Sequence, residues 1–202
     1  MRRTKADSEQ TRLHILDAAR REFARHGVTR TTLQRIAAAA GVTRGAVYWH
    51  FTNKLALFRA MREQVSLPLF DRTDLLDADA ADPLAAVERF LHDIVARIAA
   101  DLQTRRTFDI LALKCEYVDE FRPELKRHTL RCAELTDKFA VAYRRARRLG
   151  TLRADVAAET AALSTSVFVT GLLRLWLMDS DASLVRPRAD ALIAAHVAQL
   201  RA

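Results

Sequence analysis

The chain has 202 residues, of which 50% are hydrophobic and 29% charged, with only five glycines and four prolines. This composition allows one or two domains with a buried core; it predicts an all-α fold and disfavours a turn-rich β-protein. Membrane insertion and secretion are not expected, because the apolar stretch 160–173 is too short for a bilayer and no signal peptide is visible.

The N-terminal part is predicted to contain four helices, over about residues 8–26, 31–41, 44–50 and 54–68. Thr31 and Gln34 have the form of a capping box at the start of the second helix. Thr43 and Asn53 are natural N-caps for the third and fourth helices. The fourth helix is expected to end or kink near Pro68, because proline cannot donate a backbone hydrogen bond.

The C-terminal part begins with an acidic connection over residues 71–82, after which Asp82 caps a helix that has Pro83 at its first position. Further helices are predicted over about residues 83–101, 104–118, 122–149, 154–178 and 187–201. The chain is therefore expected to form about nine helices and no strand. Residues 154–178 are apolar nearly all round, so this helix and 187–201 are the best candidates for dimerisation.

The charge is concentrated near the N-terminus. Residues 1–54 contain eleven basic and four acidic residues, a net charge of +7, which leaves +1 of the total +8 for residues 55–202. A solubilising face would give the same total, but a basic segment on a nearly neutral body is typical of a protein that binds a polyanion at one end. The position of the individual charges therefore decides between these interpretations.

Residues 31–51 predict a helix-turn-helix, in which Gly41 permits the sharp turn between the helices. The second helix of such a motif enters the major groove with its N-terminal residues at the base edges. Arg44 lies in the first turn of that helix, where the helix dipole disfavours a cation unless an anion lies opposite, and Lys54 occupies the same position in the next helix. We expect Arg44 to contact a base and Lys54 a phosphate.

The exposed residues of the second helix are also suited to DNA binding. Gly45 allows the backbone to approach DNA closely, and the run Tyr48–His50 cannot be buried all on one side of a helix. We expect Tyr48 to touch a thymine methyl and its neighbours to support backbone contacts. The complete set is Thr31, Thr32, Thr43, Arg44, Gly45, Tyr48, Trp49, His50 and Lys54.

The run TTLQRIAAAAGVTRGAVYWHFTNKLALF, residues 31–58, resembles the N-terminal DNA-binding domain of TetR/AcrR-family repressors. The segments Leu113–Tyr117 (LKCEY) and Gly171–Leu177 (GLLRLWL) are similar to the AcrR/TtgR-like branch of multidrug-efflux regulators. The resemblance implies an all-helical homodimer that represses an efflux operon and leaves its palindromic operator when a lipophilic drug binds. It assigns residues 1–54 to DNA binding and 55–202 to ligand binding and dimerisation.

The resemblance also implies where the ligand binds. Phe108 and Ala112 stand where TtgR-like proteins have polar pocket residues, so the pocket should be more apolar here. Ser166 and Thr170 are small polar groups that could orient a ligand. The predicted ligand-binding residues are Phe90, Ile94, Phe108, Leu111, Ala112, Leu135, Phe139, Ser166, Val169, Thr170 and Leu173.

Other classes of function find less support. No metal-ligand spacing, nucleophile motif or phosphate-binding loop is present, so we expect no metal, no cofactor and no enzyme activity. Cys115 and Cys132 are expected to be small buried thiols of a cytoplasmic protein. The expected partners are double-stranded operator DNA, a lipophilic inducer and a second copy of the chain, with no membrane. The main alternative is an architectural DNA-binding dimer without an inducer; a carrier or enzyme that kept the fold is a third.

Overall fold

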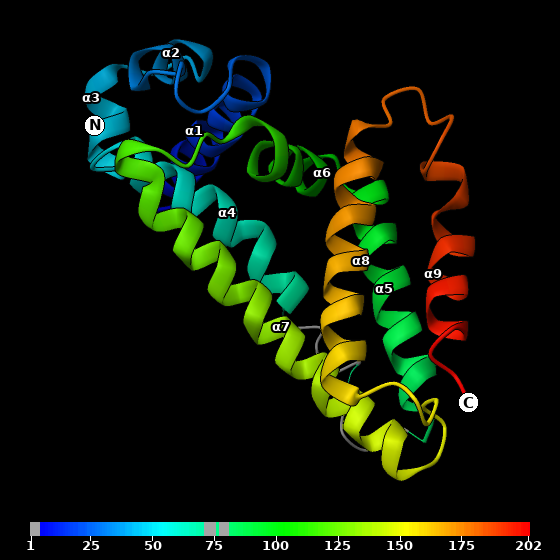
Figure 1. The fold of residues 1–202 in the computed structure, drawn as a ribbon. Helices are drawn as coiled ribbons and strands as arrows, with labels where there is room; N and C mark the ends of the chain where they lie inside the picture. The colour runs from blue at the N-terminus through cyan, green and yellow to red at the C-terminus, as the bar shows by residue number, and fades with distance from the viewer. Residues whose placement is uncertain (1–4, 71–75, 77–80) are drawn as a thin grey trace. The chain divides into compact units, whose positions relative to one another are not determined.

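The computed structural model describes residues 5–70, 76 and 81–202. Over these residues the chain forms nine α-helices, and the only extended pairing among them is an isolated bridge between Leu152 and Arg201. The all-α prediction is therefore confirmed. The helices are α1 (Lys5–His26), α2 (Leu33–Ala39), α3 (Arg44–His50), α4 (Lys54–Phe70), α5 (Pro83–Ala100), α6 (Leu102–Asp109), α7 (Arg122–Arg148), α8 (Ala158–Met178) and α9 (Ala189–Ala198) (Figure 1).

The chain forms two compact units. The first contains Met1–Pro68 and Asp101–Arg122, and the second contains Leu69–Ala100 and Pro123–Ala202. Helix α6 belongs to the first unit because it packs against α1, a long-range contact that local sequence patterns do not reveal. The predicted functional division into residues 1–54 and 55–202 remains a prediction, since compactness alone does not assign function.

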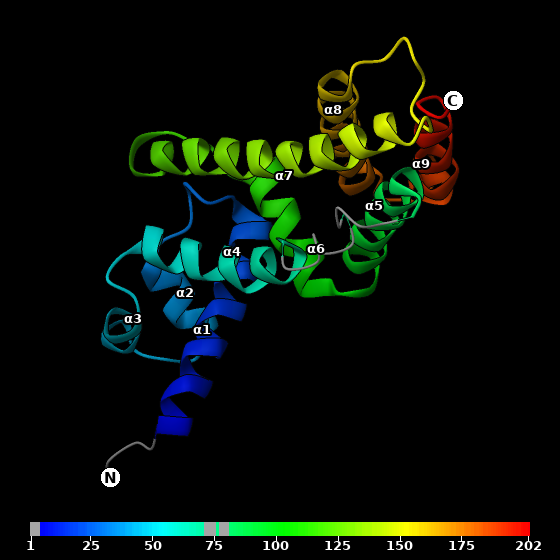
Figure 2. The same cartoon turned by 90° about the horizontal axis from the view of Figure 1, so that it is seen from below.

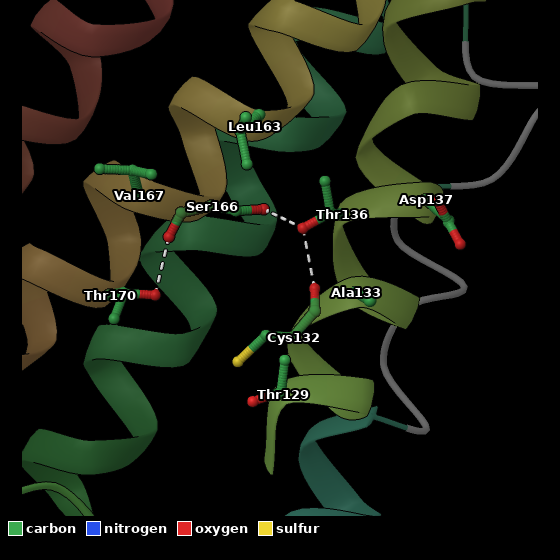
Figure 3. A pocket seen from close by; sticks show the side chains of 9 residues that line it. All are labelled: Thr129, Cys132, Ala133, Thr136, Asp137, Leu163, Ser166, Val167 and Thr170. Atoms are coloured by element: carbon green, nitrogen blue, oxygen red, sulfur yellow. Dashed lines mark hydrogen bonds between the residues drawn. The ribbon is translucent and has the colours of Figure 1, made fainter. Parts of the chain in front are cut away.

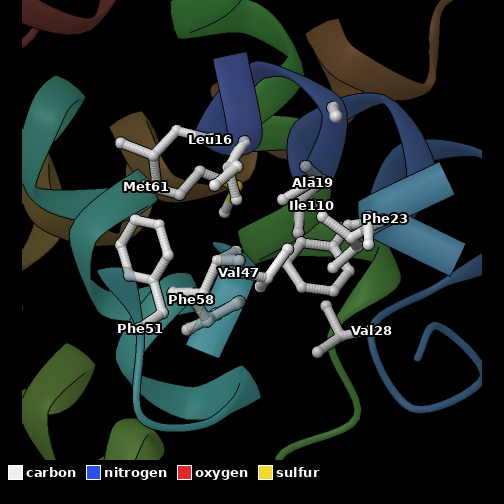
Figure 4. Packing of buried hydrophobic residues seen from close by; sticks show 14 of the residues in the cluster. Leu16, Ala19, Phe23, Val28, Val47, Phe51, Phe58, Met61 and Ile110 are labelled. Carbon is white, nitrogen blue, oxygen red and sulfur yellow. The ribbon is translucent and has the colours of Figure 1, made fainter. Parts of the chain in front are cut away.

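The first unit is built around the apolar face of α1. Phe23 packs edge-on against Phe58 of α4, with ring centroids 6.3 Å apart, and both side chains are fully buried. Val47 of α3 and Ile110, which follows α6, are buried in the same cluster (Figure 4). Burying a side chain of this size contributes roughly 1.5–3 kcal/mol, so the position of α3 is fixed by packing and not by its seven residues alone.

A buried arginine links three helices of this unit. Arg20 of α1 is 1% exposed; its Nε donates to Thr107 Oγ1 in α6 at 3.0 Å, and its Nη2 donates to Gln64 Oε1 in α4 at 2.9 Å. Burial lowers the pKa of Arg20, an effect opposed by the nearby carboxylate of Asp17. Sequence analysis did not distinguish this residue from the exposed arginines of α1.

The second unit is a bundle of α5, α7, α8 and α9. Helices α5, α8 and α9 run side by side, with α9 packed against both α5 and α8, and α7 runs obliquely across them (Figures 1 and 2). Phe90 of α5 and Phe139 of α7 meet edge to face, with centroids 5.8 Å apart. A chain of hydrogen bonds connects α7, α8 and α9: Tyr143 Oη of α7 lies 2.7 Å from Thr165 Oγ1 of α8, which lies 2.9 Å from His196 Nε2 of α9.

Helix α8 has one buried and one exposed apolar face. By length and composition alone this helix could cross a membrane, whereas residues 160–173 were expected to be too short to do so. Its inner face, which includes Ala161, Thr165 and Val169, is buried in the bundle, as a core helix requires. Its outer face exposes four large apolar side chains, so the single chain leaves this surface uncovered: Leu163, Val167, Leu175 and Met178.

The predicted helix over residues 104–118 is wrong in extent. Helix α6 starts earlier, because the Asp101 carboxylate accepts hydrogen bonds from the backbone amides of Gln103 and Thr104. It ends at Asp109, and a short π-helix, Ile110–Lys114, follows. The Lys114 carbonyl then accepts from the Val28 amide at 3.0 Å, a partner outside the helix, and the chain continues in an extended conformation.

The other helix boundaries depart less from prediction. Helix α4 continues past Pro68 to Phe70, and α8 begins at Ala158. Asn53 and Asp82 cap their helices as predicted, accepting from the amides of Ala56 and Ala85. Most of the predicted connection 71–82 lies outside the described residues. Both cysteines are free and half-buried, so neither is the fully buried thiol that was expected.

Candidate nucleic-acid interface and ligand site

Helices α2 and α3 form the predicted helix-turn-helix. Gly41 adopts a φ of +65°, the left-handed conformation that the turn needs, and Thr43 Oγ1 accepts from the Ala46 amide at 3.2 Å. The predicted capping box of Thr31 and Gln34 is wrong, because Thr32 is the N-cap of α2. Thr31 is buried instead, and its hydroxyl donates to the Gly27 carbonyl at 2.7 Å, which closes the preceding turn.

The exposed side of α3 carries a preorganised arginine. Arg44 Nη2 donates to Tyr48 Oη at 3.1 Å, and the guanidinium lies 5.3 Å from the centre of the Tyr48 ring. Tyr48 is 44% exposed and Trp49 is 72% exposed, so large apolar and aromatic surface faces solvent here. A methyl group added at Gly45 would meet only Thr43 Oγ1, at 3.8 Å, so the fold itself does not require a glycine at this position.

Trp49 and His50 enclose a small hollow between α1 and α3. Their rings meet edge to face with centroids 4.6 Å apart, and Ser8 and Ala46 complete the lining. The hollow has a volume of about 230 Å³. Of the predicted DNA-binding residues of α3, His50 is half-buried and the others are exposed: Arg44, Gly45, Tyr48 and Trp49. Thr32 and Thr43 lie at the two helix starts.

Lys54, at the start of α4, is engaged within the protein. Its Nζ donates to the carbonyls of Val28 and Thr29, at 3.0 and 3.2 Å. The same ammonium lies 3.9 Å from Glu120 Oε1 and 5.4 Å from the centre of the Phe121 ring. The Lys54 side chain is 17% exposed, and its expected contact with a DNA phosphate remains a prediction.

The predicted ligand-binding residues occupy different environments. Phe90, Ile94, Phe139 and Val169 are buried in the core of the second unit. Two leucines and a serine of the set are half-buried in that unit, namely Leu135, Leu173 and Ser166, and Thr170 is exposed. The remaining three, Phe108, Leu111 and Ala112, are half-buried and belong to the first unit.

A hollow lies between α7 and α8 of the second unit (Figure 3). Its volume is about 500 Å³, in the range of small-molecule sites. Ser166 and Thr170 line it as predicted ligand residues, and Ser166 Oγ lies 2.7 Å from Thr136 Oγ1. The other lining residues are Thr129, Cys132, Ala133, Asp137, Leu163 and Val167.

Five residues of α7 line this hollow and were not among the predicted ligand-binding residues. The positions 129, 132, 133, 136 and 137 recur at the three- and four-residue spacing of one helix face, and that periodicity could have grouped them. Burial raises the pKa of the Cys132 thiol, which keeps it protonated at neutral pH and poorly nucleophilic. Within the described ranges, no group of three or more potential metal ligands is present.

These features define a class of protein. A short helix docked by its apolar side presents an arginine and two exposed aromatic residues from a basic segment, and a separate helical bundle carries a small-molecule-sized hollow. That combination is typical of helix-turn-helix DNA-binding regulators.

The family follows from two matches. Residues 15–61 match the tetR family of bacterial regulatory proteins, and residues 82–201 match the C-terminal region of MAATS-type transcriptional repressors. The chain belongs to the tetR family, whose members are transcriptional regulators. Repressors of this family bind operator DNA and small-molecule ligands and function as dimers.

Related proteins are similar along most of the chain. The regulator TtgR of Pseudomonas putida is 39% identical over 190 residues, which cover 90% of this chain and 87% of TtgR. NalD, the secondary repressor of the MexAB-OprM multidrug efflux pump in Pseudomonas aeruginosa, has a TM-score of 0.85 at 33% identity and covers 98% of both chains. SmeT of Stenotrophomonas maltophilia, in complex with triclosan, has a TM-score of 0.82 at 30% identity, over 96% of this chain and 92% of SmeT.

Proposed function

We propose that this protein represses a multidrug efflux operon and leaves a palindromic operator when a lipophilic small molecule binds. Residues 1–54 bind DNA in this proposal, and residues 55–202 bind the ligand and dimerise. The protein works in the cytoplasm, on the nucleoid when it is bound to DNA, and catalyses no reaction. The efflux target is supported by the names of the relatives NalD and SmeT.

The exposed face of α3 carries the DNA-binding part of the proposal. Arg44 lies in the first turn of the helix, where the helix dipole repels a cation in the free protein. Its guanidinium is held by Tyr48, so it is already ordered before DNA is bound, which lowers the entropic cost of base recognition. The side-chain fork of arginine fits the O6 and N7 acceptors of guanine.

The outer face of α8 and the neighbouring α9 support the dimer interface. Met178 and Leu175, which do not line the hollow, are 57% and 50% exposed, and Leu192 of α9 adds a further exposed apolar side chain. Contiguous apolar surface of this kind is typical of protein–protein interfaces. Two recognition helices separated by one turn of DNA, about 34–36 Å, would then read the two halves of a palindrome.

The ligand-binding part rests on apolar residues with few polar groups. Lipophilic compounds bind such sites mainly by shape, so several different compounds should compete. The inducer and the operator are expected to oppose each other through a reciprocal coupling energy, typically about 1–3 kcal/mol. The fourth helix, α4, is proposed to shift on ligand binding and to change the spacing of the recognition helices.

The experiment begins by selecting and sequencing the genomic fragments that the purified protein binds. Triclosan, hydrophobic antibiotics, flavonoids and dyes are then titrated into the protein–operator complex. Binding in the micromolar range with loss of operator affinity supports the proposal. If no compound binds, or if binding leaves operator affinity unchanged, the architectural dimer is favoured instead.

A substitution then tests the location of the ligand. Val169→Trp is expected to fill the predicted site and abolish ligand binding while operator binding persists. Because Val169 is 4% exposed, the larger side chain costs roughly 1–3 kcal/mol of stability, and thermal unfolding must confirm that the variant is folded. Ligand binding that survives in a folded variant would place the ligand elsewhere.

A further inference from the structure

The turn between α1 and α2 is held by a segment from much later in the chain. Residues 110–121, which we call the connector, follow α6 and lead to α7. The Val28 amide donates to the Lys114 carbonyl at 3.0 Å, and Thr29 Oγ1 donates to Glu116 Oε2 at 3.1 Å. All of these residues belong to the first unit.

The turn itself sets the position of the DNA-reading helices. Gly27 has a φ of +79°, and a side chain there would lie 3.5 Å from the Lys114 carbonyl oxygen. Val28 is fully buried, and Thr31 bonds back to Gly27 immediately before the N-cap of α2. A displacement of this turn would therefore shift the start of α2 and, through it, α3.

Lys54 connects this turn to the connector. Its ammonium donates to two carbonyls of the turn and lies beside Glu120 and over the Phe121 ring. Phe121 is 3% exposed and packs edge-on against Phe58 of α4, with centroids 5.2 Å apart. Lys54, the first residue of α4, thus contacts both the turn and the connector.

The connector is also anchored at its other end. Ile110 is fully buried among the residues of α1 and α4, and Tyr117 Oη donates to the Leu111 carbonyl at 2.9 Å. Residues 110–114 form a π-helix, a local departure from α-helical hydrogen bonding that is frequent at functional sites. The connector is therefore fixed on both sides of its contacts with the turn.

We propose that Lys54 is a positioning residue for operator recognition, which fixes the α1–α2 turn against the connector, with Glu116 in a supporting role. This inference rests on the proposed DNA-binding function and differs from the expected phosphate contact of Lys54. A phosphate contact would act only in the complex, whereas a positioning residue also acts in the free protein.

The test compares full-length Lys54→Met with wild type and with Lys126→Met, which removes an exposed cation from α7. Operator affinity of Lys54→Met should fall about five- to 150-fold, the effect of one ordinary hydrogen bond lost in each of the two protomers. The salt dependence of operator binding should keep its slope. In the free protein, hydrogen exchange of the Val28 amide should accelerate in Lys54→Met and stay unchanged in Lys126→Met.

Two results would overturn the proposal. If Lys54→Met lowered the salt slope by about 0.9 for each protomer while Val28 exchange stayed as in wild type, Lys54 would be a phosphate contact. Unchanged exchange without any loss of affinity would also exclude a positioning role. Glu116→Ala removes the acceptor of the Thr29 hydroxyl but no positive charge, so an acceleration of Val28 exchange in that variant, smaller than in Lys54→Met, would support the proposal independently. Hydrogen exchange is measured in the free protein. The role of Lys54 in holding the turn can therefore be tested even if the protein does not bind an operator.

Discussion

The contact between Arg44 and Tyr48 provides the sharpest test of how this protein reads DNA. Arg44→Ala removes the proposed base contact and leaves the core intact, because the side chain is exposed. A bidentate arginine–guanine pair discriminates by about 1–3 kcal/mol, and a dimer uses two of them. The specific affinity relative to a scrambled duplex should therefore fall by about 2–6 kcal/mol, or at least about 30-fold.

Tyr48→Phe separates positioning from contact. This change removes the hydroxyl that accepts from Arg44 Nη2 at 3.1 Å but keeps the ring under the guanidinium. The loss should be about 0.5–1 kcal/mol per half-site, the lower part of the range for one hydrogen bond, because the pair is exposed. Combined with Arg44→Ala, the tyrosine substitution should add little, since both changes act through the same side chain.

The assay is fluorescence anisotropy with operator and scrambled duplexes at several salt concentrations. Arg30→Ala is the matched control, because Arg30 is an exposed cation of the same unit whose Nε donates to the His26 carbonyl. It should lower both affinities about equally. The reasoning would be refuted if Arg44→Ala also weakened both duplexes equally, or if Tyr48→Phe and Arg44→Ala were fully additive.

Three further predictions concern dimerisation, pH and stability. Leu175→Asp should weaken dimerisation at least about tenfold in analytical ultracentrifugation, because it places a carboxylate on the apolar outer face of α8. Val141→Asp on α7 should not weaken it, and equal effects would argue against this interface. Burial lowers the pKa of His196, so the folded state prefers the neutral ring. The free energy of unfolding should be highest above the ordinary histidine pKa of 6.5 and should fall as the pH drops below it. Urea unfolding should show a shallower pH dependence in His196→Gln. Unfolding that did not depend on His196 over that range would contradict the hydrogen bond to Thr165 as a neutral-ring contact. Arg20→Met should lower the free energy of unfolding by about 1.5–3 kcal/mol, because Thr107 and Gln64 lose a charged donor; a more stable variant would mean that desolvation of the guanidinium outweighs these bonds.

The sequence alone was sufficient for the local features of the DNA-reading motif. Gly41 ends α2 in a left-handed turn and Thr43 caps α3, as predicted, because caps and turns depend on residues within a few positions of one another. Helical periodicity likewise predicted an all-α chain. The charge of residues 1–54 indicated a polyanion partner without any knowledge of the fold.

Only the tertiary structure decided which polar side chains are engaged inside the protein. Lys54 and Arg20 carry the same charge as their exposed neighbours, but contacts with residues far along the chain bury most of their surface. The connector departs from the predicted helix because Lys114 bonds to Val28 in place of a helical partner. The hollow between α7 and α8 joins positions about thirty residues apart, such as Thr136 and Ser166. Such pairings depend on how helices pack in space, and periodicity along one helix specifies which face is buried but not which distant residue covers it.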